Sequence, residues 1–203
     1  MVVYILITAA GSSSRMRGTD KLMQVVDNMP LIRRQAARAR AASPLVGVTL
    51  SPSHPDRMLA IAGLDVAPCM LSDATEGMAA SLRHAARSAS MYAGDMTATA
   101  IMVVPADMPE LTTDDLCRMM DAHAASPASI LRATAEDGTV GHPVLFPRDL
   151  WPDLLTLRGD QGARTLLQRY ADRVTEVALP RAHAITDLDT PEDWTNWTAN
   201  RTE

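Results

Sequence analysis

Short apolar runs alternate with longer helix-forming segments along this chain, and that alternation restricts the folds open to it. Strands that alternate with helices form a mostly parallel sheet with helices on both faces. We therefore expect an α/β fold in which ligands bind beyond the carboxyl ends of the strands. The expected strands are 2–8, 46–50, 65–67, 100–104, 129–133, 143–146 and 174–178. The expected helices are 31–42, 55–62, 77–91, 112–124, 161–170 and 191–197.

A loop of small and cationic residues follows the first apolar run. Residues 9–11 read Ala-Ala-Gly, and three serines, Arg15, Gly18 and Lys21 come after them. Small residues let backbone N–H groups approach an anion closely, and the two cations neutralise its charge. The loop lacks the spacing of a dinucleotide-binding fingerprint and of a P-loop. We interpret it as a polyphosphate-binding loop, and the alternative is an ordinary solvated connector.

Composition excludes several classes of protein. The 203 residues suffice for a well-buried core, so we expect residues 1–203 to form a single domain. The net charge of −5 argues against a general nucleic-acid or membrane-surface binder. Cys69 and Cys117 form no C-x-x-C pair, so neither a thiolate metal site nor a disulfide framework is expected. No stretch reaches the length of a transmembrane helix, and a cytoplasmic location is expected.

Asp107 is the carboxylate whose position in the fold the sequence pattern predicts most clearly. It follows the apolar run 100–104 and lies between Pro105 and Pro109, which restrict the local chain. We therefore expect it at the carboxyl end of a central strand, beside the Gly/Ser loop. Mg²⁺ binds to one or two carboxylates together with substrate phosphates and water. Asp107 is thus a predicted metal ligand, and the alternative is a cap for the following turn.

A second acidic group spans residues 187–193 and precedes the last predicted helix. Thr190 before Pro191, with acids in the first turn, makes a good helix start whatever the function. One of these acids can also complete a metal site with Asp107. We choose Asp189 for that role.

Three further positions have both a structural and a functional interpretation. Gly77 opens a helix whose N-terminal amides can hold a ligand oxygen, although ordinary capping explains it equally well. Arg164 lies in the first turn of a predicted helix, an unfavourable position for a cation, so we expect an anionic partner for it. His142 lies in a Gly/Pro turn and is more often structural. No zinc-type histidine spacing and no G-x-S-x-G elbow occurs.

The motifs TAAGSSSRMRGTDKL, EGMAASL, VPADMP, GHPVLFP, LRGDQGAR and DLDTPEDW, in this order, resemble those of the molybdenum cofactor nucleotidyltransferases. The likeness runs from about residue 4 to residue 197 and is strongest to the cytidylyltransferase branch. The first and third motifs occur in many nucleotidyltransferases, whereas GHPV, GD-x-GAR and D-x-DTPED narrow the resemblance to the molybdopterin-type enzymes. The resemblance implies a three-layer α/β/α fold of the Rossmann-like nucleotide-diphospho-sugar transferase type.

The resemblance also implies a reaction. The terminal phosphate of molybdopterin, or of its molybdenum complex, attacks the α-phosphorus of CTP, pyrophosphate leaves, and a pterin dinucleotide forms. Because the nucleophile belongs to the substrate, no protein nucleophile is needed. Mg²⁺ or Mn²⁺ is the implied cofactor. CTP and molybdopterin are the implied partners, together with a recipient molybdoenzyme or its chaperone, and neither nucleic acid nor a membrane is expected.

Residue roles carry over by position. Arg15, Lys21 and Asp107 take the catalytic roles, with Asp107 and Asp189 as metal ligands. The residues expected to contact the nucleotide are Thr8, Ala9, Ala10, Gly11, Ser12, Arg15, Lys21, Gly77, Met78 and Ser81. The residues expected on the pterin side are His142, Asp160 and Arg164.

The first residues of the loop, 8–11, indicate which nucleotide base the site binds. The cytidylyl branch resembles the TAAG of residues 8–11, whereas the guanylyl branch tends to LAGG, so CTP is the predicted nucleotide. The chain departs from many relatives at Arg17, which lengthens the loop by one residue between Met16 and Gly18. Three alternatives stay open: a GTP-dependent guanylyltransferase, a nucleotidyltransferase for a sugar or alditol phosphate, and a non-catalytic molybdenum cofactor carrier or chaperone.

Overall fold

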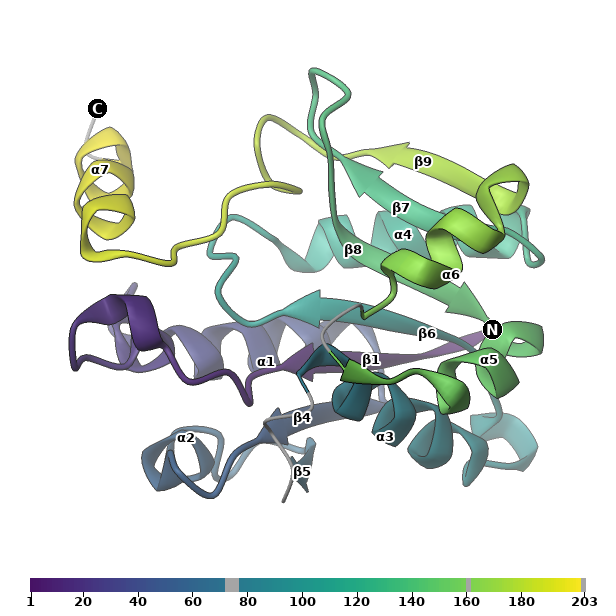
Figure 1. The fold of residues 1–203 in the computed structure, drawn as a ribbon, viewed down its shortest axis with the longest axis horizontal. Coiled ribbons are helices and arrows are strands. Elements are labelled where there is room, and N and C mark those ends of the chain that lie inside the picture. Colours follow the sequence, from purple (N-terminus) through teal and green to yellow (C-terminus); the bar gives the residue numbers. More distant parts are fainter. Residues whose placement is uncertain (72–76, 160–161, 202–203) are drawn as a thin grey trace.

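A single mixed sheet runs through the middle of the protein (Figure 1). The computed structural model describes residues 1–71, 77–159 and 162–201. Within these residues, seven strands form the sheet in the order β5-β4-β1-β6-β8-β7-β9. Their bounds are β1 Val2–Thr8, β4 Val46–Leu50, β5 Ala67–Met70, β6 Ala98–Pro105, β7 Ile130–Thr134, β8 Val140–Pro147 and β9 Val174–Ala178.

The direction of β8 differs from that of the other strands in this sheet. β8 pairs antiparallel with both β6 and β7, whereas the other pairings in the sheet are parallel. Its amino end therefore lies at the edge where the neighbouring strands have their carboxyl ends. As a result, Gly141 and His142 lie at the same edge as the residues that follow β1 and β6.

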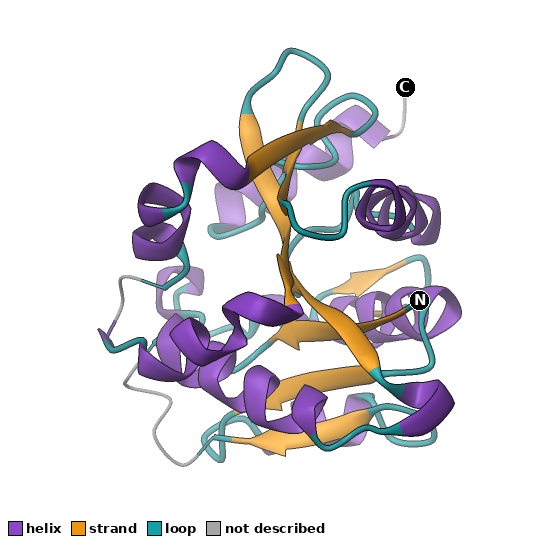
Figure 2. Cartoon of the chain, turned by 90° about the vertical axis from the view of Figure 1, so that its right-hand side faces the viewer, coloured by secondary structure: helices purple, strands orange, loops and turns teal. Residues whose placement is uncertain are grey.

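Helices cover both faces of the sheet (Figure 2), which confirms the expected mostly parallel α/β fold. α1 (Leu31–Ala42) and α4 (Thr113–Ala125) pack against one face. α3 (Met78–Ser90), α5 (Trp151–Thr156) and α6 (Arg164–Arg169) pack against the other. α2 (Pro55–Ala60) and α7 (Pro191–Arg201) lie beyond the carboxyl ends of the strands, with α7 beside the loop after β1 (Figure 1).

Short elements complete the description of the chain. β2 and β3 form a two-stranded hairpin apart from the main sheet. The bounds of the short elements are β2 Val25–Val26, β3 Met29–Pro30, and the 3₁₀ turns Ser14–Met16, Lys21–Met23, Gly94–Met96, Arg148–Leu150 and Ala171–Arg173. None of the helices in the described part of the chain has both the length and the apolar character that a membrane span requires.

Residues 100–104 of the central strand β6 are buried on both faces, which explains their wholly apolar sequence. Met102 and Val104 point into the core beneath α1 and α4, and Ile101 and Val103 point into the core beneath α3 and α5. Chemistry-bearing side chains are therefore confined to the ends of this strand. Asp107 follows it directly.

Most predicted elements are confirmed, and several have their predicted bounds, namely β1, α1, β4 and β9. The strand predicted at 65–67 exists as β5, but its predicted bounds are wrong, because it spans Ala67–Met70. Residues 64–66 form a turn after α2, and the pairing with β4 begins only at Ala67. Pro68 obscured this edge strand in the sequence, because proline is tolerated in a strand where its missing N–H needs no partner. α5 and the β2–β3 hairpin were not predicted. The helix predicted at 161–170 spans Arg164–Arg169, and residue 161 lies outside the described residues.

Gly141 packs so closely that a larger residue cannot be accommodated. A Cβ at this position would lie 1.9 Å from the backbone oxygen of Ala184, and backbone yields less readily than a side chain. Overpacking of this kind costs roughly 1–3 kcal/mol. We predict that Gly141→Ala lowers the melting temperature by several degrees, measured by circular dichroism. Gly11→Ala, where nothing lies within 4 Å of the new Cβ, is the matched control and should melt like the wild type.

Candidate active site

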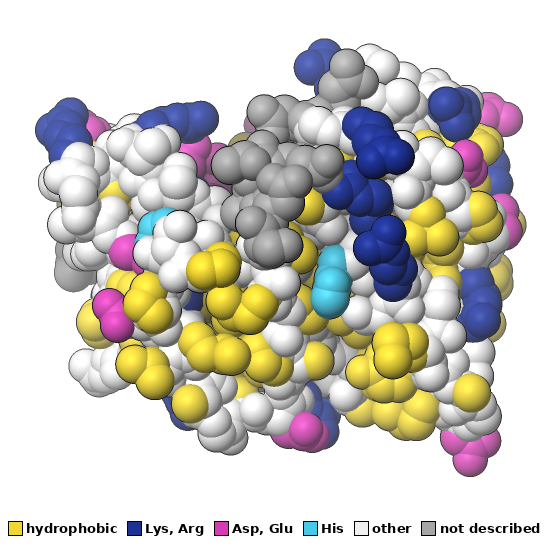
Figure 3. Space-filling model, turned by 60° about the horizontal axis from the view of Figure 1, so that its bottom comes forward, with side chains coloured by type: hydrophobic (Ala, Val, Ile, Leu, Met, Phe, Trp, Pro, Cys, Tyr) yellow, Lys and Arg dark blue, Asp and Glu magenta, His cyan; other side chains and the backbone are white. Residues whose placement is uncertain are grey.

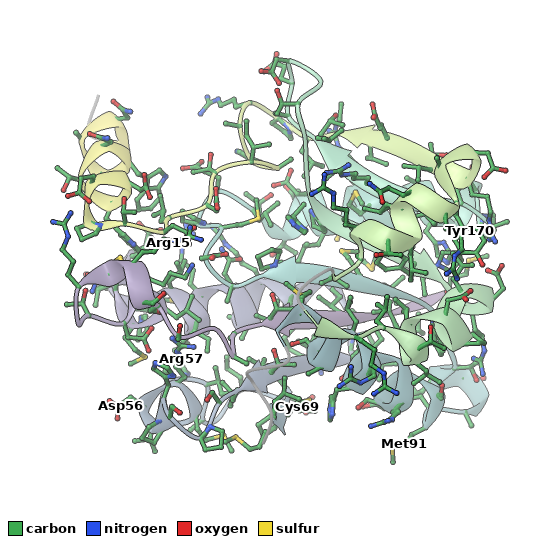
Figure 4. The ribbon with its side chains drawn as sticks, viewed as in Figure 1. Arg15, Asp56, Arg57, Cys69, Met91 and Tyr170 are labelled. Atoms are coloured by element: carbon green, nitrogen blue, oxygen red, sulfur yellow. The ribbon has the colours of Figure 1, made fainter. Side chains whose placement is uncertain are left out.

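A buried arginine from α2 holds the loop after β1 in place (Figure 4). The side chain of Arg57 is fully buried, and its Nη1 donates to the carbonyl oxygens of Ala9 (2.6 Å) and Gly11 (2.7 Å). Its Nε and Nη2 donate to the carboxylate of Asp20 at 2.7 and 2.8 Å, and Nη2 also donates to Ser13 Oγ at 3.0 Å. One guanidinium thus joins both ends of the loop. No feature of the sequence motif indicated this role, because Arg57 lies in a separate helix.

Asp20 is ionised in this arrangement. Burial opposes its charge, but the hydrogen bonds and positive charge of Arg57 outweigh burial and lower the pKa of the carboxyl below its usual value. Asp20 also accepts from the backbone N–H of Leu22 at 3.0 Å and so caps the turn that begins at Lys21. The Arg57–Asp20 pair therefore determines where Lys21 stands.

A cavity of about 230 Å³ opens against this loop, between β1, α3 and the end of β6. The residues predicted to contact the nucleotide line it, with two exceptions. Ser12 and Arg15 do not belong to its lining, since Arg15 is turned outward with 70% of its side chain exposed. The predicted residues that line the cavity are Thr8, Ala9, Ala10, Gly11, Lys21, Gly77, Met78 and Ser81.

The side chain of Lys21 brings the two predicted metal ligands together. Its Nζ lies 2.5 Å from Asp107 Oδ2 and 2.6 Å from Asp189 Oδ1. Burial favours the neutral amine, but the two carboxylates outweigh burial and raise the pKa of Lys21, so its ammonium is charged. Arg15 donates to the other oxygen of Asp189. Two carboxylates from distant segments therefore face one cation at the rim of the cavity.

Helix α1 and the segment before α7 hold these carboxylates in position. The amide of the buried Gln35 donates to the carbonyl oxygen of Met108 at 2.5 Å, which fixes the turn after Asp107. The backbone N–H of Leu188 donates to the carbonyl oxygen of Asp107 at 3.1 Å. The position of Asp189 beside Asp107 thus follows from backbone contacts as well as from Lys21.

The donor set fits a divalent cation that shares its coordination with a substrate. In the described ranges, no group of three His, Cys, Asp or Glu side chains is arranged to hold a metal ion unaided. Two converging carboxylates leave the remaining positions to phosphate oxygens and water, which is the usual arrangement for Mg²⁺. The helix-start interpretation of residues 187–193 is confirmed, because Asp193 accepts from the N–H groups of Asp189 and Thr190, whereas the metal role of Asp189 stays a prediction.

Asp187 is a site residue that the sequence did not single out. It lines a second cavity, of about 340 Å³, together with Asp107, Asp189 and His142. Burial, followed by the charge of Asp107, raises the pKa of Asp187 above its ordinary value. Its position two residues before Asp189 is the signal that could have identified it.

The residues predicted for the pterin side stand around a third cavity. His142 lines both the second and the third cavity, and Arg164 lines the third, whose volume is about 700 Å³. Met78 lines both the first and the third, so the three cavities adjoin one another. No anionic protein partner of Arg164 is found in the part of the chain that the structure describes, so the expected anionic partner stays a prediction. Asp160 lies outside the described residues.

Arg17, the extra residue of the loop, faces α7. It adopts a left-handed backbone conformation with φ of 52°, and its Nη2 donates to Glu192 Oε1 at 2.7 Å. Both side chains are exposed, so the pair contributes little to stability. Its effect is to connect the loop to the last helix.

This chain is similar in sequence and fold to known proteins. Residues 5–174 match the family model described as the MobA-like NTP transferase domain. The purine catabolism protein PucB of Bacillus subtilis (strain 168) is 32% identical over 114 residues, which are 55% of this chain and 53% of PucB. The match thus spans about half the length of that relative.

Solved structures extend the likeness to the whole chain. Rv0371c from Mycobacterium tuberculosis H37Rv has a TM-score of 0.81 and 28% identity, with 96% of each chain covered. Rv0371c in complex with manganese has a TM-score of 0.76 and 24% identity, with 97% of each chain covered. CMP:2-keto-3-deoxy-manno-octonic acid synthetase complexed with CTP has a TM-score of 0.72 and 15% identity, covers 100% and 99% of the two chains, and shows a shared fold alone.

The role of Arg57 can be tested through stability. Arg57→Met removes one partner of a buried ion pair and leaves the Asp20 carboxylate without it, which costs about 3 kcal/mol. We predict this loss in urea unfolding at neutral pH. The matched control is Arg40→Met, which breaks the exposed Arg40–Asp65 pair and should change stability by less than about 1 kcal/mol.

The pH dependence provides a second readout. Because the pKa of Asp20 is lowered in the folded protein, its contribution is present at neutral pH and is lost as the pH falls through that lowered pKa. The difference between wild type and Arg57→Met should therefore shrink in strongly acidic buffer. A difference that stays constant with pH would show that the ion pair is not its source.

Proposed function

The chain belongs to the family of MobA-like NTP transferase domains, and we propose that it transfers CMP from CTP to the terminal phosphate of molybdopterin or of its molybdenum complex. The observation that carries the proposal is the convergence of Lys21, Asp107 and Asp189 at the rim of the cavity beneath the loop after β1. Nucleotidyl transfer needs a held triphosphate, carboxylates for a divalent metal and an open side for the acceptor.

The residues of the chain act by positioning and by neutralising charge. The backbone N–H groups of Ala10 and Gly11 contact the triphosphate, and Lys21 neutralises charge that develops on the leaving pyrophosphate. Arg15 acts from the rim through its contact with Asp189. Asp107 and Asp189 would hold Mg²⁺ or Mn²⁺, which supplies Lewis-acid neutralisation of the phosphates. The manganese complex of Rv0371c supports this choice of metal.

Two further details concern the substrates. The TAAG sequence at residues 8–11, which lines the first cavity, favours CTP over GTP, and the CTP complex of a protein with the same fold supports it. The acceptor enters from the adjoining cavities, where His142 and Arg164 stand. Because the acceptor phosphate is itself the nucleophile, the side chains need only orient it toward the α-phosphorus. Asp160 completes the proposed pterin side, and the cytoplasm is the proposed location.

Pyrophosphate release with CTP or GTP tests the assignment. With molybdopterin and Mg²⁺ present, kcat/KM for CTP should exceed that for GTP by at least about tenfold, because a purine and a pyrimidine fill the same pocket differently. A preference for GTP would assign a guanylyltransferase. Turnover of sugar or alditol phosphates with no response to molybdopterin would contradict the acceptor, and tight pterin binding without turnover would indicate a carrier.

Asp107→Asn tests the metal role. The amide keeps the shape of the side chain but removes its charge, so Mg²⁺-dependent turnover should fall by at least about a hundredfold while the melting temperature stays near that of the wild type. The matched control is Asp121→Asn on the exposed side of α4, which should leave kcat unchanged. Equal turnover by wild type and Asp107→Asn would show that Asp107 has no role in binding the metal.

A further inference from the structure

The side chain of Arg132 occupies an unusual place for an arginine. It lies in the middle of β7, in register with Val144 of β8 on one side and Glu176 of β9 on the other. Its neighbours Ile130 and Val144 belong to the core beneath α3, α5 and α6, so Arg132 projects from the same face of the sheet. Arginine in the interior of a sheet needs partners for its charge and its donors.

The structure provides Arg132 with few such partners. Its Nε is buried and has no hydrogen-bond partner, and no ion pair of Arg132 is found within residues 1–71, 77–159 and 162–201. The carboxylate of Glu176 shares its register position but makes no ion pair with it. Since an unsatisfied buried donor is costly, native structures rarely keep one without a reason.

The imidazole of His142 lies beside the guanidinium of Arg132. Its Nδ1 is buried and has no hydrogen-bond partner among the residues that the structure describes. Burial, followed by the positive charge of Arg132, lowers the pKa of His142, so its imidazole is neutral at pH 7 and can donate one hydrogen bond without adding charge. Two unsatisfied groups, one cationic and one neutral, therefore lie close together.

Both side chains line the cavity of about 700 Å³ that adjoins the nucleotide cavity at Met78. Apolar residues such as Leu82 and Leu167 form much of its wall. A cavity of this volume accommodates a small organic molecule, and its polar groups orient the ligand. On the lower face of the protein, Lys and Arg side chains gather in one column while acidic ones lie toward the margins (Figure 3).

We propose that Arg132, together with His142, binds the phosphate group of the acceptor in this cavity and thereby selects a phosphate monoester over the corresponding alcohol. The proposal rests on the proposed function in one respect, namely that the adjoining cavity holds the nucleotide. A guanidinium that binds the acceptor phosphate reduces the repulsion between two polyanions, which allows the acceptor to approach the α-phosphorus.

Binding of a fluorescent pterin pair tests the proposal. The probes are 6-hydroxymethylpterin and its phosphate monoester, titrated into the 203-residue chain without metal or nucleotide. Wild type should bind the ester at least about tenfold more tightly than the alcohol, because charge-assisted hydrogen bonds are the stronger class. Arg132→Met should lose that preference, whereas Arg132→Lys should keep part of it. For each variant, the dissociation constant of the alcohol is divided by that of the ester. Because both constants come from the same variant, a general loss of stability does not produce a loss of the preference.

Two controls exclude other sites. Arg118→Met removes the same charge from the exposed surface of α4 and should keep the wild-type ratio. Lys21→Ala should also keep it, because Lys21 belongs to the nucleotide cavity. Retention of the preference in Arg132→Met, its absence in the wild type, or its loss in Lys21→Ala but not in Arg132→Met would each overturn the proposal.

The proposed acceptor and the role of Arg132 can fail separately. Phenyl phosphate is titrated as a competitor that carries the phosphate without the pterin. If it binds as tightly as the pterin ester and Arg132→Met weakens both, the phosphate site stands and the pterin acceptor fails. If the pterin ester binds far more tightly and Arg132→Met leaves both unchanged, the pterin acceptor stands and Arg132 has no role in it.

Discussion

The contact of the Arg57 guanidinium with the loop after β1 is the interaction on which the site depends most directly. A loop that binds phosphate must present N–H groups outward, so its carbonyl oxygens need partners elsewhere. Arg57 supplies those partners for Ala9 and Gly11 and at the same time binds Asp20. Because Asp20 caps the turn that begins at Lys21, the same contact places the lysine beside the carboxylates.

The reversed direction of β8 is the second constraint. In an all-parallel sheet, the residues before a strand would lie at the opposite edge from the residues after its neighbours. Since β8 runs antiparallel to β6, its amino end brings His142 to the edge where Asp107 follows β6. Because of this reversal, Gly141 and His142 line both the second and the third cavity, while Met78 joins the third cavity to the first.

The site has two regions of opposite charge, one around Lys21 and one around Arg132. Around Lys21 the carboxylates of Asp107, Asp187 and Asp189 prevail, which suits a metal ion that can in turn bind a triphosphate. Around Arg132 the positive charge lacks a protein counterpart among the described residues, which suits an anion brought by the acceptor. The two proposals of a nucleotide side and an acceptor side follow from this division.

The sequence by itself determined the α/β alternation, the bounds of β1 and α1, and the place of Asp107 at a strand end. These features depend on local periodicity and on residues adjacent in the chain, so they can be predicted without contacts. The tertiary structure alone decided that Asp189 meets Lys21 across 168 residues, that Arg57 holds the loop, and that the Nε of Arg132 is buried without a hydrogen-bond partner among the described residues. Which polar groups are desolvated together depends on the order of strands and the packing of helices, and no local pattern encodes it.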